Sequence, residues 1–427
     1  MLIEFIVKNF RSIKEEQIFS MVKASKIKDD ELEASNTFKT NDQNNTELLA
    51  SAVIYGANAS GKSNFVNALR CMNTIVKHSS TSLQEGDSLP VEPFLFDEST
   101  SEAPSEFEAV FIYDDIKYQY GFSATQARVH DEWLIAFPKQ RPQKWFSRVF
   151  DEETQEYDYK FSDNLLGNKQ IWHNATRDNA LFLSTAVQLN SEQLKPVFNW
   201  FRHVLQPVIN FDNWGPRYTG PFCLDDGFKR RVIDLLQAAD LNIHDLAIES
   251  KKFDSSLLPD ELPQEIKEKI HQEMKDEEIL DIRTVHKTQS GKLVTLDLEE
   301  ESDGTQKLFS IAGPLLDVLE KGYILVIDEL HNSFHPKMVE GIIRLFHNKE
   351  VNKHNAQLIF STHETSVLNQ HVFRRDQIWF CEKEKFGETS IYPLTDFSPR
   401  KADRENLEAG YLSGKYGAVP FITSLGG

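Results

Sequence analysis

The chain has 427 residues, of which 40% are hydrophobic and 26% are charged, the composition of a globular protein large enough for one α/β domain with an insertion. No apolar run approaches the roughly 18 residues of a membrane span, the acidic start at residues 1–5 differs from a secretory signal, and three scattered cysteines fit a reducing cytoplasm. A net charge of −19 argues against nonspecific binding of nucleic-acid backbones by the whole surface.

A phosphate-binding loop is the first motif along the chain. Residues 56–63 read G-A-N-A-S-G-K-S and match G-x-x-x-x-G-K-[ST] at every fixed position. The apolar run at 48–55 predicts a buried parallel strand before the loop, and apolar spacing over 64–74 predicts a helix after it. Because backbone N–H groups at a helix N-terminus favour a polyphosphate, we predict nucleotide contacts from Gly56, Asn58, Ala59, Ser60, Gly61, Lys62, Ser63 and Asn64. Lys62 is predicted to reach the β- and γ-phosphates of ATP, and the Ser63 hydroxyl to bind Mg²⁺.

Regions of different pattern follow the loop. Residues 90–162 alternate between apolar and polar, which predicts an antiparallel β region, with a short strand expected at 93–96. Residues 179–275 carry apolar residues at three- and four-residue spacing, which predicts helices. Strands are predicted again at 282–286 and 293–298.

A second turn made of small residues precedes a helix predicted at 308–319. It reads Ser302-Asp303-Gly304-Thr305-Gln306, and such a turn at a helix N-terminus is an anion-binding device. Since one subunit has no need of two such devices for a single ATP, the simplest arrangement places Ser302, Gly304 and Gln306 on the γ-phosphate held by another subunit. The alternative is an ordinary helix capped by Ser302 or Asp303.

The apolar run at 324–327 predicts a second buried parallel strand, and it ends in Asp328 and Glu329. Ligands of open α/β sheets gather at the carboxyl ends of the strands. Asp328 is therefore predicted to hold Mg²⁺, and Glu329 to polarise a water for in-line attack on the γ-phosphate. The alternative is a strand that ends in a solvated acidic turn.

A third apolar run, at 358–360, ends in Ser361, Thr362 and His363. A neutral histidine at this tip can donate to a γ-phosphate oxygen or orient the attacking water, so His363 is a predicted catalytic residue. His331 and His335 have the spacing of a helical zinc pair. We reject that interpretation because the glutamate of H-E-x-x-H is missing and Pro336 follows at once, and we predict a turn instead.

In chain order the four motifs resemble the Walker A, signature, Walker B and H-switch motifs of ABC-type ATPase heads of the SbcC, RecF and SMC kind. The start at residues 5–12 resembles the N-F-[RK]-S start of such heads, which implies nucleotide-side roles for Asn9, Phe10 and Arg11. A closer resemblance is to stand-alone phage-defence ATPases of the RloA and AbiLi type, through segments 93–96, 132–134 and 181–184 and the tail at 406–420. The signature departs from the family pattern because it lacks a leading L-S-G-G.

The resemblance implies an α/β fold: an ABC-type ATPase head whose P-loop sheet is flanked by an antiparallel β-subdomain and carries a helical insertion. We place the first half of the head at residues 1–178, the insertion at 179–280 and the second half at 281–427. No sustained heptads occur in the insertion, so no long coiled-coil arm is expected.

The function implied is an enzyme, an ATPase that binds ATP and Mg²⁺, dimerises or assembles further around the nucleotide, and hydrolyses it in the cytoplasm. The family resemblance further implies a sensor or switch that controls a nuclease or toxin partner in defence against phage. One alternative is a DNA-repair head, for which short basic groups could serve: Lys229, Arg230 and Arg231; Arg374 and Arg375; Arg400, Lys401 and Arg404. Another alternative is a nucleotide-dependent scaffold with little hydrolysis.

Overall fold

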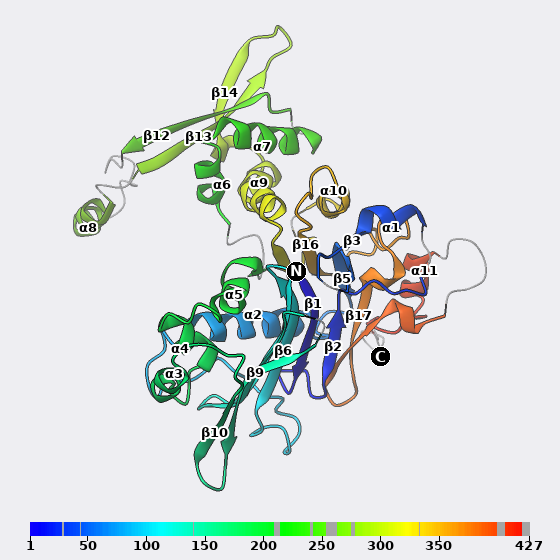
Figure 1. Ribbon diagram of the computed structural model, residues 1–427. Coiled ribbons are helices and arrows are strands. Elements are labelled where there is room, and N and C mark those ends of the chain that lie inside the picture. Colours follow the sequence, from blue (N-terminus) through cyan, green and yellow to red (C-terminus); the bar gives the residue numbers. More distant parts are fainter. Residues whose placement is uncertain are drawn as a thin grey trace. The chain divides into compact units, whose positions relative to one another are not determined.

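Figure 1 shows a computed structural model of the protein, which describes residues 1–27, 30–42, 44–139, 141–208, 214–239, 242–252, 263–274, 278–332, 334–398 and 406–420. The chain divides into two compact units, one made of residues 1–210 and 318–427 and the other of residues 211–317. Within the described part of the chain, none of the helices has the length and apolar character that crossing a membrane requires.

A six-stranded sheet in the first unit has the strand order β11-β15-β16-β5-β17-β18. Neighbouring strands from β11 to β17 are parallel, and β18 pairs antiparallel with β17. The strands are β5 (Ser51–Tyr55), β11 (Leu205–Val208), β15 (Ile324–Ile327), β16 (Gln357–Thr362), β17 (Ile378–Lys383) and β18 (Thr389–Pro393). Every residue of β5, β15 and β16 is buried, as expected of interior parallel strands. The predicted α/β class and these three buried strands are confirmed.

The carboxyl ends of three neighbouring strands lie at one edge of this sheet. Ile327 of β15 pairs with Phe360 of β16, and Thr362 of β16 pairs with Tyr55 of β5. Strand β5 leads into the phosphate loop and helix α2 (Lys62–His78), and β15 leads through a turn into α10 (Pro336–His347). The register therefore brings the three sequence motifs that follow these strands to the same edge.

A seven-stranded antiparallel sheet has the order β10-β9-β8-β7-β6-β1-β2. Its strands are β1 (Leu2–Lys8), β2 (Gln17–Ser20), β6 (Ser105–Tyr113), β7 (Ile116–Ala124), β8 (Val129–Phe137), β9 (Gln143–Asp151) and β10 (Glu156–Phe161). This confirms the antiparallel region predicted at 90–162. The strand predicted at 93–96 is wrong: the segment is a loop, because the backbone N–H of Phe94 donates to the Asn9 side chain and not to a neighbouring strand.

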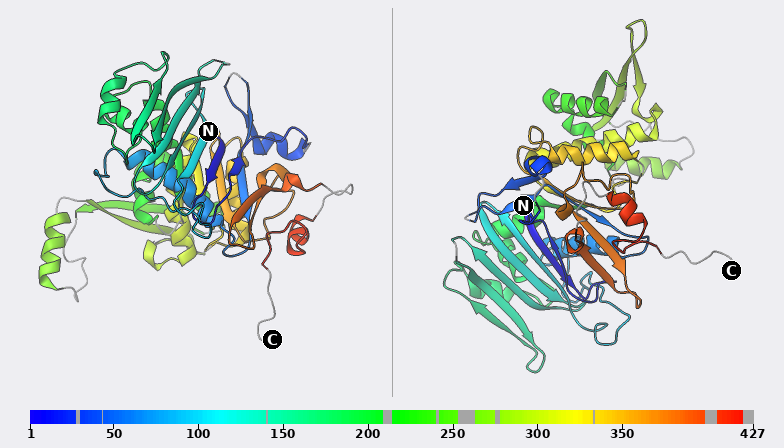
Figure 2. Two further views of the ribbon diagram at one scale, coloured as in Figure 1. Left: turned by 90° about the horizontal axis from the view of Figure 1, so that it is seen from below. Right: turned by 90° about the vertical axis from the view of Figure 1, so that its right-hand side faces the viewer.

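Helix α2 lies in the hydrophobic core that joins the two sheets. Its Phe65 ring packs on Phe5 and Phe19 of the antiparallel sheet at centroid distances of 5.6 and 5.2 Å, and the same core includes Ile54 and Ile359 of the parallel sheet. Further short helices pack beside α2 on the antiparallel sheet (Figure 2): α3 (Lys169–Ala175), α4 (Phe182–Gln188), α5 (Lys195–Asn199) and the π-helix η1 (Trp200–Val204). The phosphate-loop helix is thus fixed by apolar packing along its length.

A fully buried ion pair ties α4 to the antiparallel sheet. The Glu132 carboxylate of β8 accepts the backbone N–H groups of Phe182 and Leu183 at 2.6 and 2.9 Å, and the Tyr120 hydroxyl at 3.0 Å. Arg148 lies 3.7 Å from Glu132, and both side chains have zero exposure. The two segments singled out at 132–134 and 181–184 therefore meet at this carboxylate.

The second unit contains a three-stranded antiparallel sheet and several helices. The strands are β12 (Asp245–Lys252), β13 (Glu278–Lys287) and β14 (Leu293–Asp297), and the helices are α6 (Pro216–Phe222), α7 (Asp226–Ala238), α8 (Gln264–Met274) and the 3₁₀-helix η4 (Leu298–Glu300). Helix α9 (Asp303–Lys321) starts here and ends in the first unit. Strands β11 and β12 correct the prediction of helices throughout 179–275, because pairing with β15 and β13 makes these segments extended.

The remaining elements of the first unit are short. They are α1 (Asp30–Asn36), β3 (Thr37–Lys39), β4 (Glu47–Leu49), η5 (Arg375–Gln377), η6 (Leu394–Asp396) and α11 (Leu407–Leu412). Arg374 is fully buried and pairs with Asp376 at 2.8 Å, and Arg375 donates to the Phe397 carbonyl. These two arginines therefore do not form the basic surface considered from the sequence, and Arg400, Lys401 and Arg404 lie outside the described residues.

Candidate active site

The phosphate loop has a backbone that its two fixed glycines make possible. A Cβ added to Gly56 would lie 2.3 Å from the Cys381 carbonyl oxygen, so the neighbouring strand β17 leaves no room for one. Gly61 has a φ of +111°, and an added Cβ would lie 2.1 Å from the Thr389 hydroxyl oxygen. Both positions therefore require glycine, one for close approach and the other also for its left-handed conformation.

Lys62 folds back over the loop. Its ammonium donates to the carbonyl oxygens of Gly56 and Ala57 at 2.6 and 2.9 Å, and the residue is only 5% exposed. Burial lowers the pKa of this ammonium, while the charges of Asp328 and Glu329 act in the opposite direction. The present acceptors are neutral carbonyls, so an anionic phosphate oxygen would be a stronger partner for the same group.

The tip of the loop is exposed and partly strained. Asn58 and Ala59 are exposed, and Ala59 has a φ of +62°. The Ser60 hydroxyl is buried and finds no hydrogen-bond partner among the residues that the structure describes. Ser63 is exposed at the start of α2, and the Asn64 amide donates to the Ser12 hydroxyl at 2.7 Å. The Ser63 hydroxyl is thus accessible for a ligand, while Asn64 is engaged within the protein.

Ser361 of β16 fixes the acidic pair at the end of β15. Its hydroxyl accepts the Glu329 backbone N–H at 2.8 Å and donates to the Asp328 carboxylate. Glu329 has a φ of +54°, and its carboxylate accepts the Asn332 amide at 2.5 Å. The Ser361 hydroxyl thus holds both acidic residues in position from the neighbouring strand, a role that the sequence analysis missed.

Two histidines lie together beside these carboxylates. The rings of His331 and His363 have centroids 3.8 Å apart and planes inclined by 69°. His331 belongs to the turn that follows β15, as predicted, and His363 is exposed at the end of β16. Lys62, Asp328, Glu329 and His363 therefore come from three neighbouring strand ends, and His331 joins them without having been predicted.

The N-terminal candidates hold a loop of the protein itself. Asn9 is buried, its amide nitrogen donates to the carbonyls of Thr100 and Ala103, and its amide oxygen accepts from Phe94. Arg11 pairs with Glu92 at 3.0 Å. Phe10 is buried, and its ring packs against Phe107 at a centroid distance of 5.4 Å. Contacts from Asn9 or Arg11 to a nucleotide stay predictions, because this geometry assigns their side chains to the loop at 92–104.

The tail at residues 406–420 packs against the phosphate loop. The Ala418 carbonyl accepts the Ala57 N–H at 2.9 Å and the Tyr411 hydroxyl at 3.0 Å. A pocket of about 280 Å³ lies between loop, β17 and tail, lined by Ala57, Asn58, Ala59, Ser60, Cys381, Glu382, Lys383, Ala418, Val419 and Pro420. In the sequence the tail is only a point of resemblance, since no motif shows that it reaches the loop.

Comparison with known proteins identifies the family. Residues 51–369 match the family described as "AAA domain, putative AbiEii toxin, Type IV TA system", a range that contains the phosphate loop and all three strand ends. The chain belongs to this AAA-domain family. The predicted recognition of an ATPase head is therefore confirmed.

Solved structures with similar folds are SMC and RecF proteins. An SMC head domain from Thermotoga maritima has a TM-score of 0.41 and 15% identity, covering 92% of this chain and 98% of that one. An SmcHead bound to the C-winged helix domain of ScpA has a TM-score of 0.39 and 13% identity, covering 92% and 97%. RecF–ATP, a recombination mediator of the RecFOR pathway, has a TM-score of 0.35 and 13% identity, covering 86% and 94%. No curated protein sequence matches the chain.

The signature segment of this AAA-domain protein starts helix α9 in the second unit. The Ser302 hydroxyl accepts the Thr305 N–H at 3.2 Å, which is the cap considered as the alternative. The Gln306 amide donates to the carbonyls of Glu299 and Glu301, and a Cβ on Gly304 would be 3.9 Å from its nearest neighbour. The contact of Ser302, Gly304 and Gln306 with another subunit's nucleotide stays a prediction.

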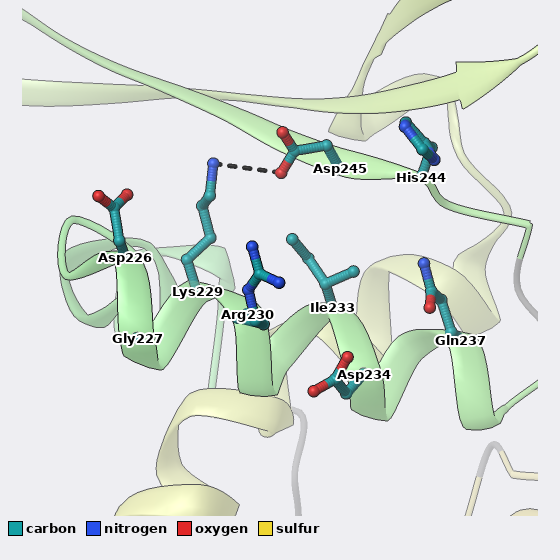
Figure 3. Close-up of a pocket in the computed structure, with 9 residues that line it drawn as sticks. All are labelled: Asp226, Gly227, Lys229, Arg230, Ile233, Asp234, Gln237, His244 and Asp245. Atoms are coloured by element: carbon teal, nitrogen blue, oxygen red, sulfur yellow. Dashed lines mark ion pairs between the residues drawn. The ribbon is translucent and has the colours of Figure 1, made fainter.

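A larger pocket, of about 770 Å³, lies between α7 and β12 of the second unit (Figure 3). Figure 3 shows Lys229 reaching across it to Asp245, at 3.2 Å. Its lining contains both signs of charge: Asp226, Gly227, Lys229, Arg230, Ile233, Asp234, Gln237, His244 and Asp245. None of the predicted ATPase residues lines it, so size alone does not mark the reactive site of this protein.

Proposed function

We propose that this protein binds ATP together with Mg²⁺ at the phosphate loop and hydrolyses it. The observation that carries the proposal is the meeting of Lys62, Asp328, Glu329 and His363 at the carboxyl ends of three neighbouring parallel strands. Lys62 exchanges its two carbonyl partners for phosphate oxygens. The other phosphate-binding groups are backbone N–H groups and hydroxyls of the loop, from Gly56, Asn58, Ala59, Ser60, Gly61 and Ser63.

The donor set around the loop fits Mg²⁺. Ser63 offers an exposed hydroxyl, and Asp328 offers a carboxylate of which one oxygen is held by Ser361. Hydroxyl and carboxylate oxygens are the hard ligands that Mg²⁺ prefers, alongside phosphate oxygens and water. When bound, the ion neutralises charge that develops on the transferring phosphoryl group.

Glu329 is the residue we assign to the attacking water. Its backbone is fixed by Ser361 and its carboxylate by Asn332, so its free oxygen is held in a defined position. The carboxylate orients the water and takes up its proton as the water attacks the γ-phosphorus, while the bond from this phosphorus to the β–γ bridging oxygen breaks and ADP leaves. His363, exposed at the adjoining strand end, donates a hydrogen bond to a γ-phosphate oxygen.

ATP binding would close two copies of the protein on each other, with Ser302, Gly304 and Gln306 of the second copy at the γ-phosphate. The support for this is the resemblance of residues 302–306 to a signature motif and their position at the start of α9. Hydrolysis would then reopen the assembly. We further propose that this cycle controls a protein partner in the cytoplasm, a nuclease or toxin that acts against phage. The toxin–antitoxin context in the family's description supports such a partner.

A Glu329→Gln variant tests the proposal. We expect it to bind ATP and to shift from monomer to dimer by light scattering when ATP and Mg²⁺ are added, while hydrolysis falls at least about 100-fold. Glu340→Gln, a substitution in α10 at a carboxylate that pairs with Arg344 of the same helix, is the matched control and should hydrolyse ATP like the unchanged protein. If the unchanged protein turns over slowly and Glu329→Gln leaves that slow rate unchanged, Glu329 is not the base and the scaffold alternative is favoured. A mass that never responds to ATP would overturn the dimer mechanism.

A further inference from the structure

His331 contains a buried ring nitrogen that no group in the described part of the chain satisfies. Its Nε2 atom is buried and has no hydrogen-bond partner among these residues. A buried polar group without a partner costs free energy, so its presence calls for an explanation. The other ring nitrogen, Nδ1, lies 3.0 Å from the Thr362 hydroxyl oxygen.

The hydrogen bonds of Thr362 allow the ring proton of His331 to be on Nε2. The Thr362 hydroxyl oxygen accepts the Glu364 backbone N–H at 3.0 Å, and its own proton can be donated to Nδ1 of His331. In a neutral imidazole one nitrogen accepts and the other donates. With Nδ1 as the acceptor, the proton of His331 is on Nε2 and the unsatisfied group is an N–H donor, and we assign this tautomer.

The surroundings of the ring keep it neutral and indicate what the donor meets. Burial lowers the pKa of His331. The neighbouring His363 and Lys62 lower this pKa further, whereas the negative charges of Glu329 and Glu364 raise it. His363 lies against the ring at a centroid distance of 3.8 Å. Lys62, Glu329 and His363 are the residues that the proposed function places around the γ-phosphate, so an anionic oxygen is the expected acceptor at this point.

We propose that the Nε2–H of His331 donates a hydrogen bond to the terminal phosphate group of bound ATP, so that two adjacent histidines, His331 and His363, distinguish the triphosphate from ADP. This inference rests on the proposed function of the same site. ADP lacks the acceptor, and the His331 donor then stays unsatisfied. The residue is thus a second determinant of the nucleotide state, placed on the turn that follows β15.

The test compares the affinities for ADP and for the nonhydrolysable triphosphate AMPPNP, each with Mg²⁺, by calorimetry. His331→Ala should weaken AMPPNP binding about tenfold and leave ADP binding unchanged, the size of one hydrogen bond to a charged group. His331→Phe keeps a ring against His363 but has no N–H, and it should behave like alanine. His331→Gln can offer an amide N–H near the same point, and it should recover most of the difference.

A matched control lies in the same turn. The exposed His335 caps α10 by accepting the Lys337 N–H, and His335→Asn preserves such a cap while changing a histidine four residues away. This variant should match the unchanged protein for both nucleotides. Melting temperatures identify any variant that fails to fold, in which case the phenylalanine and glutamine variants decide the outcome.

Several results would overturn the inference. The first is that His331→Ala and His331→Phe prefer AMPPNP over ADP as strongly as the unchanged protein does. The second is that the variants lose the same factor of affinity for both nucleotides. The third is that His331→Phe restores the preference for AMPPNP as well as His331→Gln does. The last two would indicate a packing role for the ring. If the unchanged protein binds neither nucleotide, the proposed function fails together with this inference; if it binds both and only the variants show no effect, this inference alone fails.

Discussion

Two buried polar clusters of the first unit differ in how their groups are satisfied. In the cluster around Glu132, the carboxylate has three hydrogen-bond donors, and the Arg148 guanidinium, stacked 4.2 Å from the Tyr157 ring centroid, donates to the Ala180 carbonyl. Only Nε of Arg148 lacks a partner among the side-chain atoms of this pair. At the carboxyl edge of the parallel sheet, in contrast, the Ser60 hydroxyl and the His331 Nε2 have no hydrogen-bond partner within the described ranges.

The backbone shows the same contrast. Ala59 and Glu329 at the sheet edge have φ values of +62° and +54°, which residues other than glycine adopt at a cost. Glu132 and Arg148 lie within regular strands. The Glu132 cluster therefore stabilises the fold, whereas the sheet edge keeps polar groups and backbone strain that a bound ligand can use.

The largest effect is expected from a substitution that breaks the Glu132 cluster. Glu132→Ala leaves the fully buried Arg148 and the N–H groups of Phe182 and Leu183 without their acceptor, and we expect a loss of about 3–5 kcal/mol in the free energy of unfolding. Urea denaturation measures it. Glu156→Ala, at an exposed position of β10, is the control and should change stability by less than about 0.5 kcal/mol. A loss below about 1 kcal/mol for Glu132→Ala would contradict the assigned role.

The next effect concerns ligand affinity. Lys62→Ala removes the cation that we assign to the β- and γ-phosphates, so we expect ATP affinity to fall about 100-fold or more, from two charge-assisted hydrogen bonds. Calorimetry measures affinity, and thermal unfolding should show little change because the lysine's present partners are loop carbonyls. Lys337→Ala, exposed on α10, should bind ATP normally. A strongly destabilised Lys62→Ala protein with intact affinity would reverse the distinction between the two clusters.

A third experiment uses pH on another internally satisfied group. His347 is buried, its Nε2 lies 2.8 Å from the Ser51 hydroxyl, and burial lowers its pKa to about 3. The unfolded chain, with a histidine pKa near 6.5, takes up this proton first, so stability is full above about pH 6.5 and falls as the pH decreases towards 3.

Between pH 7 and pH 5 the loss due to His347 should be roughly 2 kcal/mol. Urea denaturation of the unchanged protein and of His347→Gln at both pH values isolates this contribution, because the variant lacks the titrating group. His354→Gln is the control, since His354 is exposed. Equal pH dependence in the unchanged protein and His347→Gln would show that the histidine titrates alike in the folded and the unfolded state.

The smallest effect tests strain beside the loop. Ala418 has a φ of +58° while its carbonyl holds the Ala57 N–H. Glycine adopts this conformation at no steric cost but loses more entropy on folding, so Ala418→Gly should stabilise the protein by about 0.5 kcal/mol. Thermal unfolding measures the shift, and Ala409→Gly, within helix α11, should instead destabilise. Destabilisation by Ala418→Gly would show that the tail is not strained here.

The sequence by itself determined the parts of this protein that depend on local pattern. Strand burial and loop conformation follow from neighbouring residues. The sequence therefore predicted the phosphate loop, the apolar strands before Asp328 and His363, and the antiparallel region at 90–162. The same local character explains the error at 93–96. An apolar run there looks like a strand, but a distant amide, that of Asn9, takes its backbone N–H.

The tertiary structure alone decided which groups meet. Ser361 holds an acidic pair 32 and 33 residues earlier, and His331 contacts His363 only because β15 and β16 pair in register. The Ala418 carbonyl reaches Ala57 across almost the whole chain. Such contacts leave no periodic or spacing signal, because they depend on how distant segments pack and on which polar groups that packing leaves buried.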